Sequence, residues 1–242
     1  MQCLIIAAGQ GTRLRSLAPS KPLAEVNGVP LLGHIVRAAK AGGASSFLVV
    51  TGYEAEAIEE YLPHLSRAAG APIEPVRNPD WLRPNGLSVL AAAPHLADEF
   101  LLLMADHLFD PEIVGGLLAG RRPDAALTLA ADYHHENPEL DLDDATKLLV
   151  GEDGRIDRIG KTIEDYNAID TGIFHATTGL IDALRRSLDG GGSGSLSEGV
   201  QRLAADGSAF AHDIGDGWWI DVDDEPAFRR AERSLPPQLL RA

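Results

Sequence analysis

The sequence predicts an α/β protein built on a three-layer, doubly wound and mostly parallel sheet. Three short, fully apolar runs at 3–8, 47–50 and 100–104 have the composition of central parallel strands, which are buried on both faces. Amphipathic helical stretches lie between these runs, as right-handed strand–helix–strand units require. The length of 242 residues fits one large domain of this class.

The first half of the chain alternates between strand and helix patterns. A helix is predicted over 30–41, because its apolar residues share one stripe and Gly42-Gly43 follow the last of them. In order, the expected elements are a strand at 3–8, a helix at 30–41, a strand at 47–50, a helix at 55–62, a weaker strand at 72–76, a helix at 87–96 and a strand at 100–104.

The second half is less regular and predicts a smaller, β-rich region. Asp153-Gly154 is a typical hairpin turn between two short apolar runs, and 190–195 (GGGSGS) has the composition of a flexible loop. The expected elements are a strand at 125–130, a hairpin of 147–150 with 155–159, a strand at 173–175 and helices at 179–188, 196–205 and 225–234.

Composition and charge exclude several classes of protein. The chain has 21 Lys and Arg against 36 Asp and Glu, a formal net charge of −15. So acidic a chain is unsuited to the phosphates of nucleic acid or to an anionic membrane surface. Without an apolar run near the ~18 residues of a spanning helix, no membrane insertion is expected. The single cysteine, Cys3, excludes an internal disulfide and fits a reducing compartment, which we expect to be the cytoplasm.

A glycine-rich turn, Gly9 to Leu14, directly follows the first buried strand and lies among the basic residues of the first 40 positions. Glycines allow backbone N–H groups to approach phosphate oxygens, and a local positive pocket suits an anion such as a nucleotide. The dinucleotide fingerprint is excluded because position 14 is Leu, and the P-loop is excluded because Arg13 comes too early. The pattern AAGQGTRL followed by Lys21-Pro22 resembles the nucleoside-triphosphate transferase superfamily, the sugar-1-phosphate and alcohol-phosphate nucleotidyltransferases.

This resemblance implies a Rossmann-like nucleotidyltransferase fold with a small acceptor-binding β subregion. Gly9, Gly11 and Arg13 would hold the β- and γ-phosphates, and Lys21 would lie near the α-phosphate. Asn85–Ser88 is similar to the segment that lies under the nucleobase in the family. The nucleotide-binding residues implied in this way are Ala7, Ala8, Gly9, Gly11, Thr12, Arg13, Asn85, Gly86, Ser88 and Asp106.

Two acidic segments resemble the metal-binding segments of the same family. Asp106-His107, which follows the strand at 100–104, is similar to its G-D-H or G-D-N turn, with Ala105 in place of the usual Gly. WIDVD, ending at Asp223, resembles the segment that supplies a second carboxylate, so the implied Mg²⁺ ligands are Asp106 with Asp221 or Asp223. Carboxylates suit Mg²⁺, and an attacking phosphate that is already ionised at pH 7 needs no general base.

Finer similarity points to one subfamily, the inositol-1-phosphate cytidylyltransferases. The segments that carry it are Asn85–Ser88, Ala105–His107, Asp144–Lys147, Ile159–Lys161, Asp170–Phe174 and Leu196–Glu198. The resemblance implies transfer of CMP from CTP to inositol-1-phosphate, with Arg13, Lys21 and Lys161 as catalytic residues. The implied acceptor-binding residues are Lys147, Lys161, Asp170, Thr171 and Glu198.

Other interpretations of these residues, and other substrates, also stay open. Lys147 fits a surface ion pair equally well, and Asp170, Thr171 and Glu198 fit caps and turns. The acceptor could be phosphocholine, an aminoalkylphosphonate or a sugar-1-phosphate, and the nucleotide could be another NTP. An ammonium acceptor requires an aromatic or acidic cage, and the aromatic residues that could form one are Trp81, Trp218 and Trp219. A non-catalytic nucleotide sensor is expected to lose some of the phosphate- and metal-binding residues, but Arg13, Lys21, Asp106 and Asp223 are all present.

The expected organisation is a single nucleotidyltransferase domain over 1–242. About 1–115 would form the nucleotide-binding half, and about 116–235 the acceptor-binding half. Many relatives fuse such a domain to a membrane alcohol-phosphatidyltransferase, so a separate membrane phosphotransferase is expected downstream. A homodimer also stays open.

Overall fold

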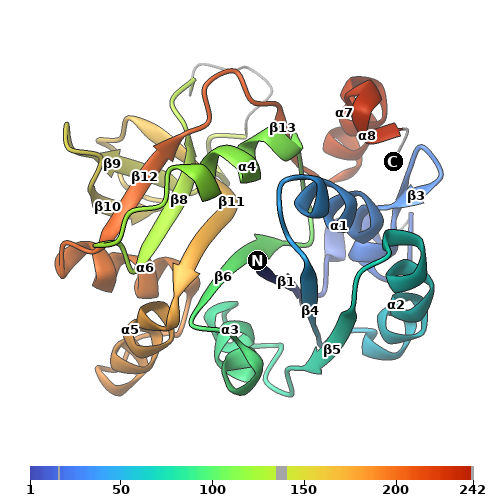
Figure 1. The fold of residues 1–242 in the computed structure, drawn as a ribbon, viewed down its shortest axis with the longest axis horizontal. Coiled ribbons are helices and arrows are strands. Elements are labelled where there is room, and N and C mark those ends of the chain that lie inside the picture. Colours follow the sequence, from blue (N-terminus) through green and yellow to red (C-terminus); the bar gives the residue numbers. More distant parts are fainter. Residues whose placement is uncertain (16, 135–140, 241–242) are drawn as a thin grey trace.

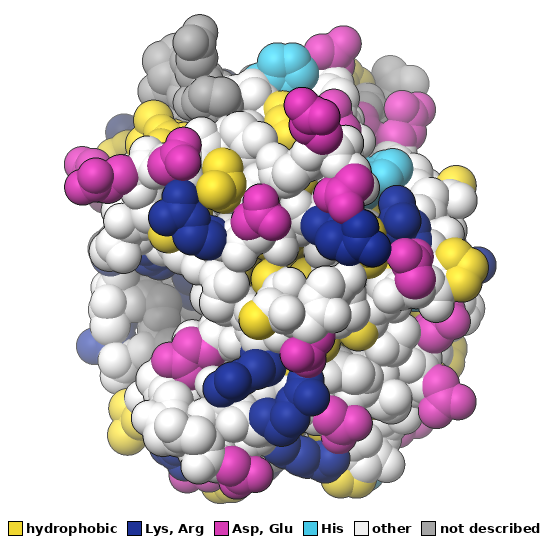
Figure 2. All heavy atoms as spheres, turned by 90° about the vertical axis from the view of Figure 1, so that its left-hand side faces the viewer, with side chains coloured by type: hydrophobic (Ala, Val, Ile, Leu, Met, Phe, Trp, Pro, Cys, Tyr) yellow, Lys and Arg dark blue, Asp and Glu magenta, His cyan; other side chains and the backbone are white. Residues whose placement is uncertain are grey.

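The computed structural model describes residues 1–15, 17–134 and 141–240. Within these residues the main sheet has nine strands, flanked by helices on both faces (Figure 1). The predicted three-layer α/β class is therefore confirmed. Acidic and basic side chains are intermixed on the face that Figure 2 shows. Among the described helices, none is long and apolar enough to cross a membrane.

Four parallel strands form one half of the sheet: β1 (Gln2–Ala7), β4 (Ser46–Thr51), β5 (Ile73–Arg77) and β6 (Glu99–Met104). The strand β1 is central, because it pairs with β4 on one side and with β6 on the other. Apolar residues along these strands alternate between two cores. On β6, Leu103 packs into the first core and Leu102 into the second.

The other half of the sheet is mainly antiparallel and is centred on β11 (Ala168–Thr177), which pairs with β6 and so joins the two halves. Its other strands are β8 (Leu127–Asp132), β9 (Lys147–Val150), β10 (Ile156–Gly160) and β12 (Ala209–Asp213). The hairpin predicted around Asp153-Gly154 is confirmed as the antiparallel pair β9–β10. The strand predicted at 173–175 is only part of the longer β11.

The helices cover the two faces separately. The first core includes apolar residues of α1 (Leu31–Ala41), α2 (Ala55–Ala69), α4 (Pro111–Ala119) and α7 (Glu225–Ser234). The second includes residues of α3 (Gly86–Ala92), α5 (Thr178–Asp189) and α6 (Leu196–Ala205). The predicted helix at 87–96 is divided into α3 and a 3₁₀ turn, Ala93–His95.

Several short elements were not predicted, and some of them build the site. The short strands β7 (His107–Phe109) and β13 (Trp219–Asp221) pair antiparallel, which places Asp221 opposite His107. The other short elements are β2 (Glu25–Val26), β3 (Val29–Pro30), α8 (Pro237–Leu240) and the 3₁₀ turns Thr12–Leu14 and Lys21–Leu23.

Candidate active site

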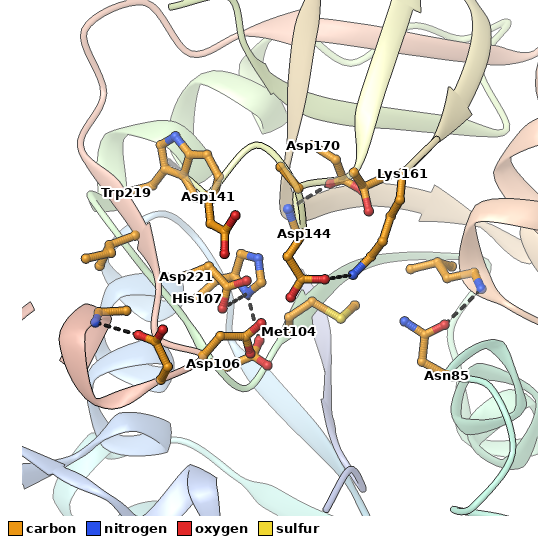
Figure 3. A pocket seen from close by; sticks show the side chains of 18 of the residues that line it. Asn85, Met104, Asp106, His107, Asp141, Asp144, Lys161, Asp170, Trp219 and Asp221 are labelled. Atoms are coloured by element: carbon orange, nitrogen blue, oxygen red, sulfur yellow. Dashed lines mark hydrogen bonds and ion pairs between the residues drawn. The ribbon is translucent and has the colours of Figure 1, made fainter. Parts of the chain in front are cut away.

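A cleft of about 300 Å³ lies where the end of β6, the strand β11 and the start of α7 meet (Figure 3). Its polar lining includes Asn85, Asp106, His107, Asp141, Asp144, Lys161, Asp170, Asp221, Asp223 and Arg230. A smaller cleft of about 240 Å³ is lined by the glycine-rich turn. Arg13, Asp106 and Asp223 line both, so the two clefts adjoin. The position beyond the carboxyl end of β6 is where open α/β sheets bind ligands.

The buried side chain of Lys21 packs closely against the backbone of the glycine-rich turn at Gly11. Gly11 has a φ of +52°, and a side chain there would collide with the side chain of Lys21. Gly9 has open space where a Cβ would lie. The turn can therefore offer its backbone N–H groups to an anion while Lys21, only 8% exposed, lies beside it.

The predicted cations and acids form one continuous series of ion pairs. The Lys21 Nζ donates to Asp106 Oδ2 at 2.8 Å and also to Asp223 Oδ1. Arg13 Nη2 donates to the other oxygen of Asp223 at 2.7 Å and to Asp144 Oδ2 at 2.8 Å. Lys161 Nζ donates to the remaining oxygen, Asp144 Oδ1. Residues from opposite ends of the sequence thus converge on one cluster of alternating charge.

The pairing fixes the charges of Lys21 and Asp106. Burial opposes the charged form of Lys21, but Asp106, Asp221 and Asp223 raise its pKa above the usual range. Burial likewise opposes the carboxylate of Asp106, but Lys21 and His107 lower its pKa well below the usual range. Both groups are therefore ionised at neutral pH, as a phosphate-binding cation and a metal-binding carboxylate need to be.

Asp106, His107 and Asp221 place ligand atoms within 4.8 Å of one another. His107 Nδ1 lies 2.7 Å from Asp106 Oδ1 and 3.8 Å from Asp221 Oδ1. Burial lowers the pKa of His107, but Asp221 and Asp106 outweigh it and raise the pKa to about 9. A protonated imidazole has no lone pair for a metal ion, so only the carboxylate oxygens could bind a hard cation, and those of Asp106 already accept from Lys21 and His107.

One carboxylate oxygen of Asp221 lacks a hydrogen-bond partner among the described residues. This oxygen, Oδ1, is buried. Burial raises the pKa of this carboxyl to about 6, against the lowering effect of His107. A buried carboxylate oxygen without a donor is costly unless a cation binds it. This orphaned oxygen and the adjacent Asp106 carboxylate fit a divalent metal ion.

Trp219 holds His107 in place from the side of the cleft. The two rings stack at a centroid distance of 5.9 Å and an interplanar angle of 10°. The indole Nε1 donates to Asp132 Oδ2 at 2.8 Å, and that aspartate is only 5% exposed. Trp219 thereby links the antiparallel half of the sheet to the acidic cluster, and both its ring and its N–H are committed to protein contacts.

Two of the predicted acceptor-binding residues, Lys161 and Asp170, line the larger cleft. Burial raises the pKa of Asp170 to about 6, partly offset by the Gly172 N–H and by His107. The Asp170 Oδ1 accepts that N–H at 2.8 Å. Asp170 is therefore a half-buried carboxyl at the cleft wall, and its second oxygen does not take part in this turn.

The other three predicted acceptor-binding residues lie outside the cleft. Thr171 is fully buried and donates to Ala130 O at 2.7 Å, because β11 turns its side chain into the core. Lys147 Nζ donates to Lys161 O at 3.0 Å. Glu198 accepts from Ser193 and Gly194, since its capping position at α6 points it at the 190–195 loop. Against expectation, this loop is anchored.

The predicted nucleotide-binding residues divide between the clefts and the layer beneath them. Ala7, Gly9, Gly11, Thr12 and Arg13 line the smaller cleft, and Asn85 and Asp106 line the larger one. The remaining predicted residues, Ala8, Gly86 and Ser88, line neither cleft. Ser88 is buried and accepts from Asn78 Nδ2 at 3.0 Å.

Asn85 has a fixed amide orientation. Its Oδ1 accepts from the backbone N–H of Leu196 at 2.9 Å, at the start of α6. Because a backbone N–H only donates, the oxygen is held there and the amide nitrogen is presented on the cleft side (Figure 3).

Sequence reasoning overlooked several residues of the cleft. Asp144 was noted only as part of a segment, although its position near the acidic cluster gives it two cationic partners. Arg230 lines the cleft from α7, and its Nε is buried with no hydrogen-bond partner among the described residues. A lone arginine in an amphipathic helix carries no sequence signal that would predict a place in the cleft.

The other two tryptophans that could have formed an aromatic cage lie apart. Trp218 lines the cleft, whereas the ring of Trp81 packs against the ring of Tyr53 at a centroid distance of 5.5 Å.

Comparison with known proteins shows which family and which proteins this chain is similar to. Residues 3–198 match the family described as MobA-like NTP transferase domain. The bifunctional IPC transferase and DIPP synthase of Rubrobacter xylanophilus is 35% identical over 96% of this chain and 51% of that protein. Its namesake from Archaeoglobus fulgidus is 32% identical over 97% of this chain and 44% of that protein. The chain thus spans about half the length of these curated relatives.

A solved structure also matches over most of its length. The inositol-1-phosphate CTP transferase from T. maritima has a TM-score of 0.83 and 25% sequence identity, over 93% of this chain and 90% of that chain. The two structures therefore share their fold over most of both chains.

Proposed function

The chain belongs to the family of MobA-like NTP transferase domains, and from that premise we propose that it transfers CMP from CTP to inositol-1-phosphate with Mg²⁺ and releases pyrophosphate. The observation that carries this proposal is the series of ion pairs through Lys21, Arg13 and Lys161. Through these ion pairs, cations from the glycine-rich turn and from the C-terminal end of β10 contact the same cluster of carboxylates. A triphosphate and a second phosphate could therefore meet there.

The reaction joins two phosphates, so charge is its main obstacle. The acceptor phosphate attacks the α-phosphorus of the nucleotide, a P–O bond forms, and the bond to the departing pyrophosphate breaks. Both reactants are anionic, so the protein must hold them in line and offset their repulsion. Arg13 and Lys21 are placed to offset the charge of the triphosphate, and Lys161 that of the acceptor.

Asp106 and Asp221 are the residues that would hold Mg²⁺. Their carboxylate oxygens are the ligand type that this ion prefers, and Asp221 Oδ1 is buried with no hydrogen-bond partner in the part of the chain that the structure describes. Magnesium would supply further positive charge for the phosphate oxygens of the nucleotide. Within the chain, His107 orients the Asp106 carboxylate through its Nδ1 contact.

The acceptor side of the cleft favours a polyol over an ammonium group. Two of the three tryptophans line the cleft, but the ring of Trp219 is covered by His107. Trp81 packs against Tyr53, so the three tryptophans do not form the cage that an ammonium acceptor needs. Asp170 and Ser197 line the cleft and could bind hydroxyl groups. The names of the relatives, which include inositol-1-phosphate CTP transferase, support the same acceptor.

The test is pyrophosphate release in the presence of Mg²⁺. CTP, UTP, GTP and ATP are each combined with inositol-1-phosphate, phosphocholine and glucose-1-phosphate. We expect release with CTP and inositol-1-phosphate and little with the other pairs. Release with a different pair would keep nucleotidyl transfer but reassign the pocket, and no release with any pair would contradict the proposal. Asp106→Ala is the matched inactive control, and it is expected to remain folded.

A further inference from the structure

Asp144 bridges the two cations that the proposed reaction assigns to different substrates. One carboxylate oxygen accepts from Arg13 Nη2 at 2.8 Å, and the other accepts from Lys161 Nζ. Arg13 lies in the glycine-rich turn and Lys161 directly follows β10, so Asp144 joins residues from the two halves of the chain where both line the larger cleft. These two contacts hold the pKa of the Asp144 carboxyl below its usual range.

The bridge uses the same donors that substrate phosphates need. A phosphate oxygen bound to Arg13 competes with the Asp144 oxygen, since both are anionic acceptors of the same N–H groups. The same holds for a phosphate bound to Lys161. The pairs are not deeply buried, because Arg13, Asp144 and Lys161 have side chains 52%, 34% and 55% exposed. Exposed pairs of this kind are weak enough for a phosphate to displace.

We propose that Asp144 is an internal placeholder for substrate phosphate, which positions Arg13 and Lys161 and couples the two phosphate sites. This inference rests on the proposed function in assigning the two sites to nucleotide and acceptor. A phosphate that takes Arg13 removes one of the two contacts that hold Asp144 and repels its carboxylate. Lys161 then loses its partner more easily. Binding at either site therefore favours binding at the other.

The coupling follows from how one carboxylate serves two cations. While Arg13 fixes Asp144, the entropy of ordering that side chain is already lost, and Lys161 gains its contact at little additional cost. Once a phosphate has bound Arg13, the contact with Lys161 alone must offset the entropy lost when the Asp144 side chain is ordered. Two weak contacts that support each other are thus released together.

The experiment compares Asp144→Asn with Asp143→Asn. Asp143 is the preceding residue, is exposed, and does not line the cleft. Both variants remove one negative charge from the same turn, so the pair separates the local contact from the change in net charge. Pyrophosphate alone, with a metal chelator, is titrated into each protein by calorimetry. D144N is expected to bind it about three- to tenfold more tightly than the wild type, and D143N by less than about twofold.

Stability and coupling supply two further readouts. The melting temperature of D144N without added ligand should equal that of the wild type or be lower, so affinity rises without a gain in stability. Saturating pyrophosphate should improve the binding of inositol-1-phosphate by a larger factor in the wild type than in D144N. A merely structural residue would lower stability and affinity together.

Unchanged or weaker pyrophosphate binding by D144N, or equal coupling factors in the two proteins, would overturn the inference. Pyrophosphate binding does not depend on turnover. A difference between D144N and D143N that persists without activity on CTP and inositol-1-phosphate would therefore contradict the proposed function alone.

Discussion

The aspartates of the cleft differ sharply in how many of their carboxylate oxygens accept hydrogen bonds. Both oxygens of Asp223 accept from cations, Oδ1 from Lys21 and Oδ2 from Arg13. Asp221 Oδ1 is buried, and none of the residues described in the structure forms a hydrogen bond with it. The resemblance to known enzymes left the choice between these two aspartates open. Their surroundings favour Asp221 as the metal ligand and Asp223 as the anchor of the phosphate-binding cations.

Asp221→Asn is expected to weaken the binding of Mn²⁺, used as a spectroscopic substitute for Mg²⁺, by at least about tenfold. An amide oxygen lacks the negative charge that a hard cation prefers. Asp223→Asn should have a smaller effect on Mn²⁺ binding, because both oxygens of Asp223 already accept hydrogen bonds from Lys21 and Arg13. Electron paramagnetic resonance of free Mn²⁺ measures both effects. The reverse ranking of the two variants would contradict the assignment.

The second residue-level prediction concerns pH and Asp170. Burial raises its pKa to about 6 in the folded chain, above the ordinary value of 3.8. The folded state therefore holds more protons than the unfolded state between those values. Stability falls as pH rises through that range and stays lower above it. Asp170→Asn imitates the protonated carboxyl and keeps the oxygen that accepts the Gly172 N–H.

D170N should equal the wild type in stability near pH 4 and exceed it by about 1–3 kcal/mol near pH 7. Urea denaturation at the two pH values measures this difference. Asp216→Asn, at an exposed position, is the control and should show no such change with pH. A gain for D170N that is the same at both pH values would show that the effect is not titration of Asp170.

Elements of regular pattern could be predicted from the sequence, and short elements could not. Continuous apolar runs identified β1, β4 and β6 because these strands are buried on both faces. The strands β7 and β13 have three residues each, too few to show a period. The helix α4 contains Gly115-Gly116, which weakened its helical signal. The missing strands are those that set Asp221 beside His107.

The predicted site residues likewise fall into two groups, those that lie at the clefts and those that do not. Arg13, Lys21 and Asp106, which sequence motifs predict as site residues, line the smaller cleft and lie in segments that follow strongly predicted elements. Thr171 and Glu198 lie outside both clefts, because a motif gives the position of a residue but not the direction of its side chain. A strand turns alternate side chains to opposite faces, and a capping position directs a glutamate to the helix start.

Gly172 shapes β11 at the cleft wall, which gives a prediction at the scale of the element. Its φ is +72°, and a Cβ would lie 2.8 Å from the His107 ring. Gly172→Ala should therefore destabilise the fold by about 1–3 kcal/mol and displace His107, with a loss of turnover. Gly191→Ala is the control, because Gly191 has a φ of +84° but no atom of the described residues lies within 4 Å of the position of a Cβ.

Thermal denaturation and pyrophosphate release measure the two effects. G191A should bear only the cost of backbone strain and keep its activity. Equal losses in the two variants would show that the contact with His107 is unimportant.

At the scale of the whole molecule, one sheet is shared by two hydrophobic cores. Adjacent residues of β6 serve opposite cores, with Leu102 in one and Leu103 in the other. The strand β11 pairs with β6 and so connects the parallel half of the sheet to the strands around Asp170. Shared strands of this kind make the two halves depend on each other, as a single domain over the chain would require.

Leu102→Ala and Leu103→Ala should each lower the free energy of unfolding by about 2–5 kcal/mol. Urea denaturation followed by circular dichroism and by tryptophan fluorescence should give coincident midpoints in the wild type and in both variants. Two separated transitions, or a variant that shifts only one probe, would indicate that the halves unfold independently.

The central place of β1 has a consequence for how the protein is made on the ribosome. This strand leaves the exit tunnel before either of its neighbours, and the residues of β6 that pair with it begin only at Phe100. Meanwhile an apolar segment with two unpaired edges is exposed to other nascent chains. We therefore expect the emerging polypeptide to depend on chaperones that shield apolar segments until β6 has been synthesised.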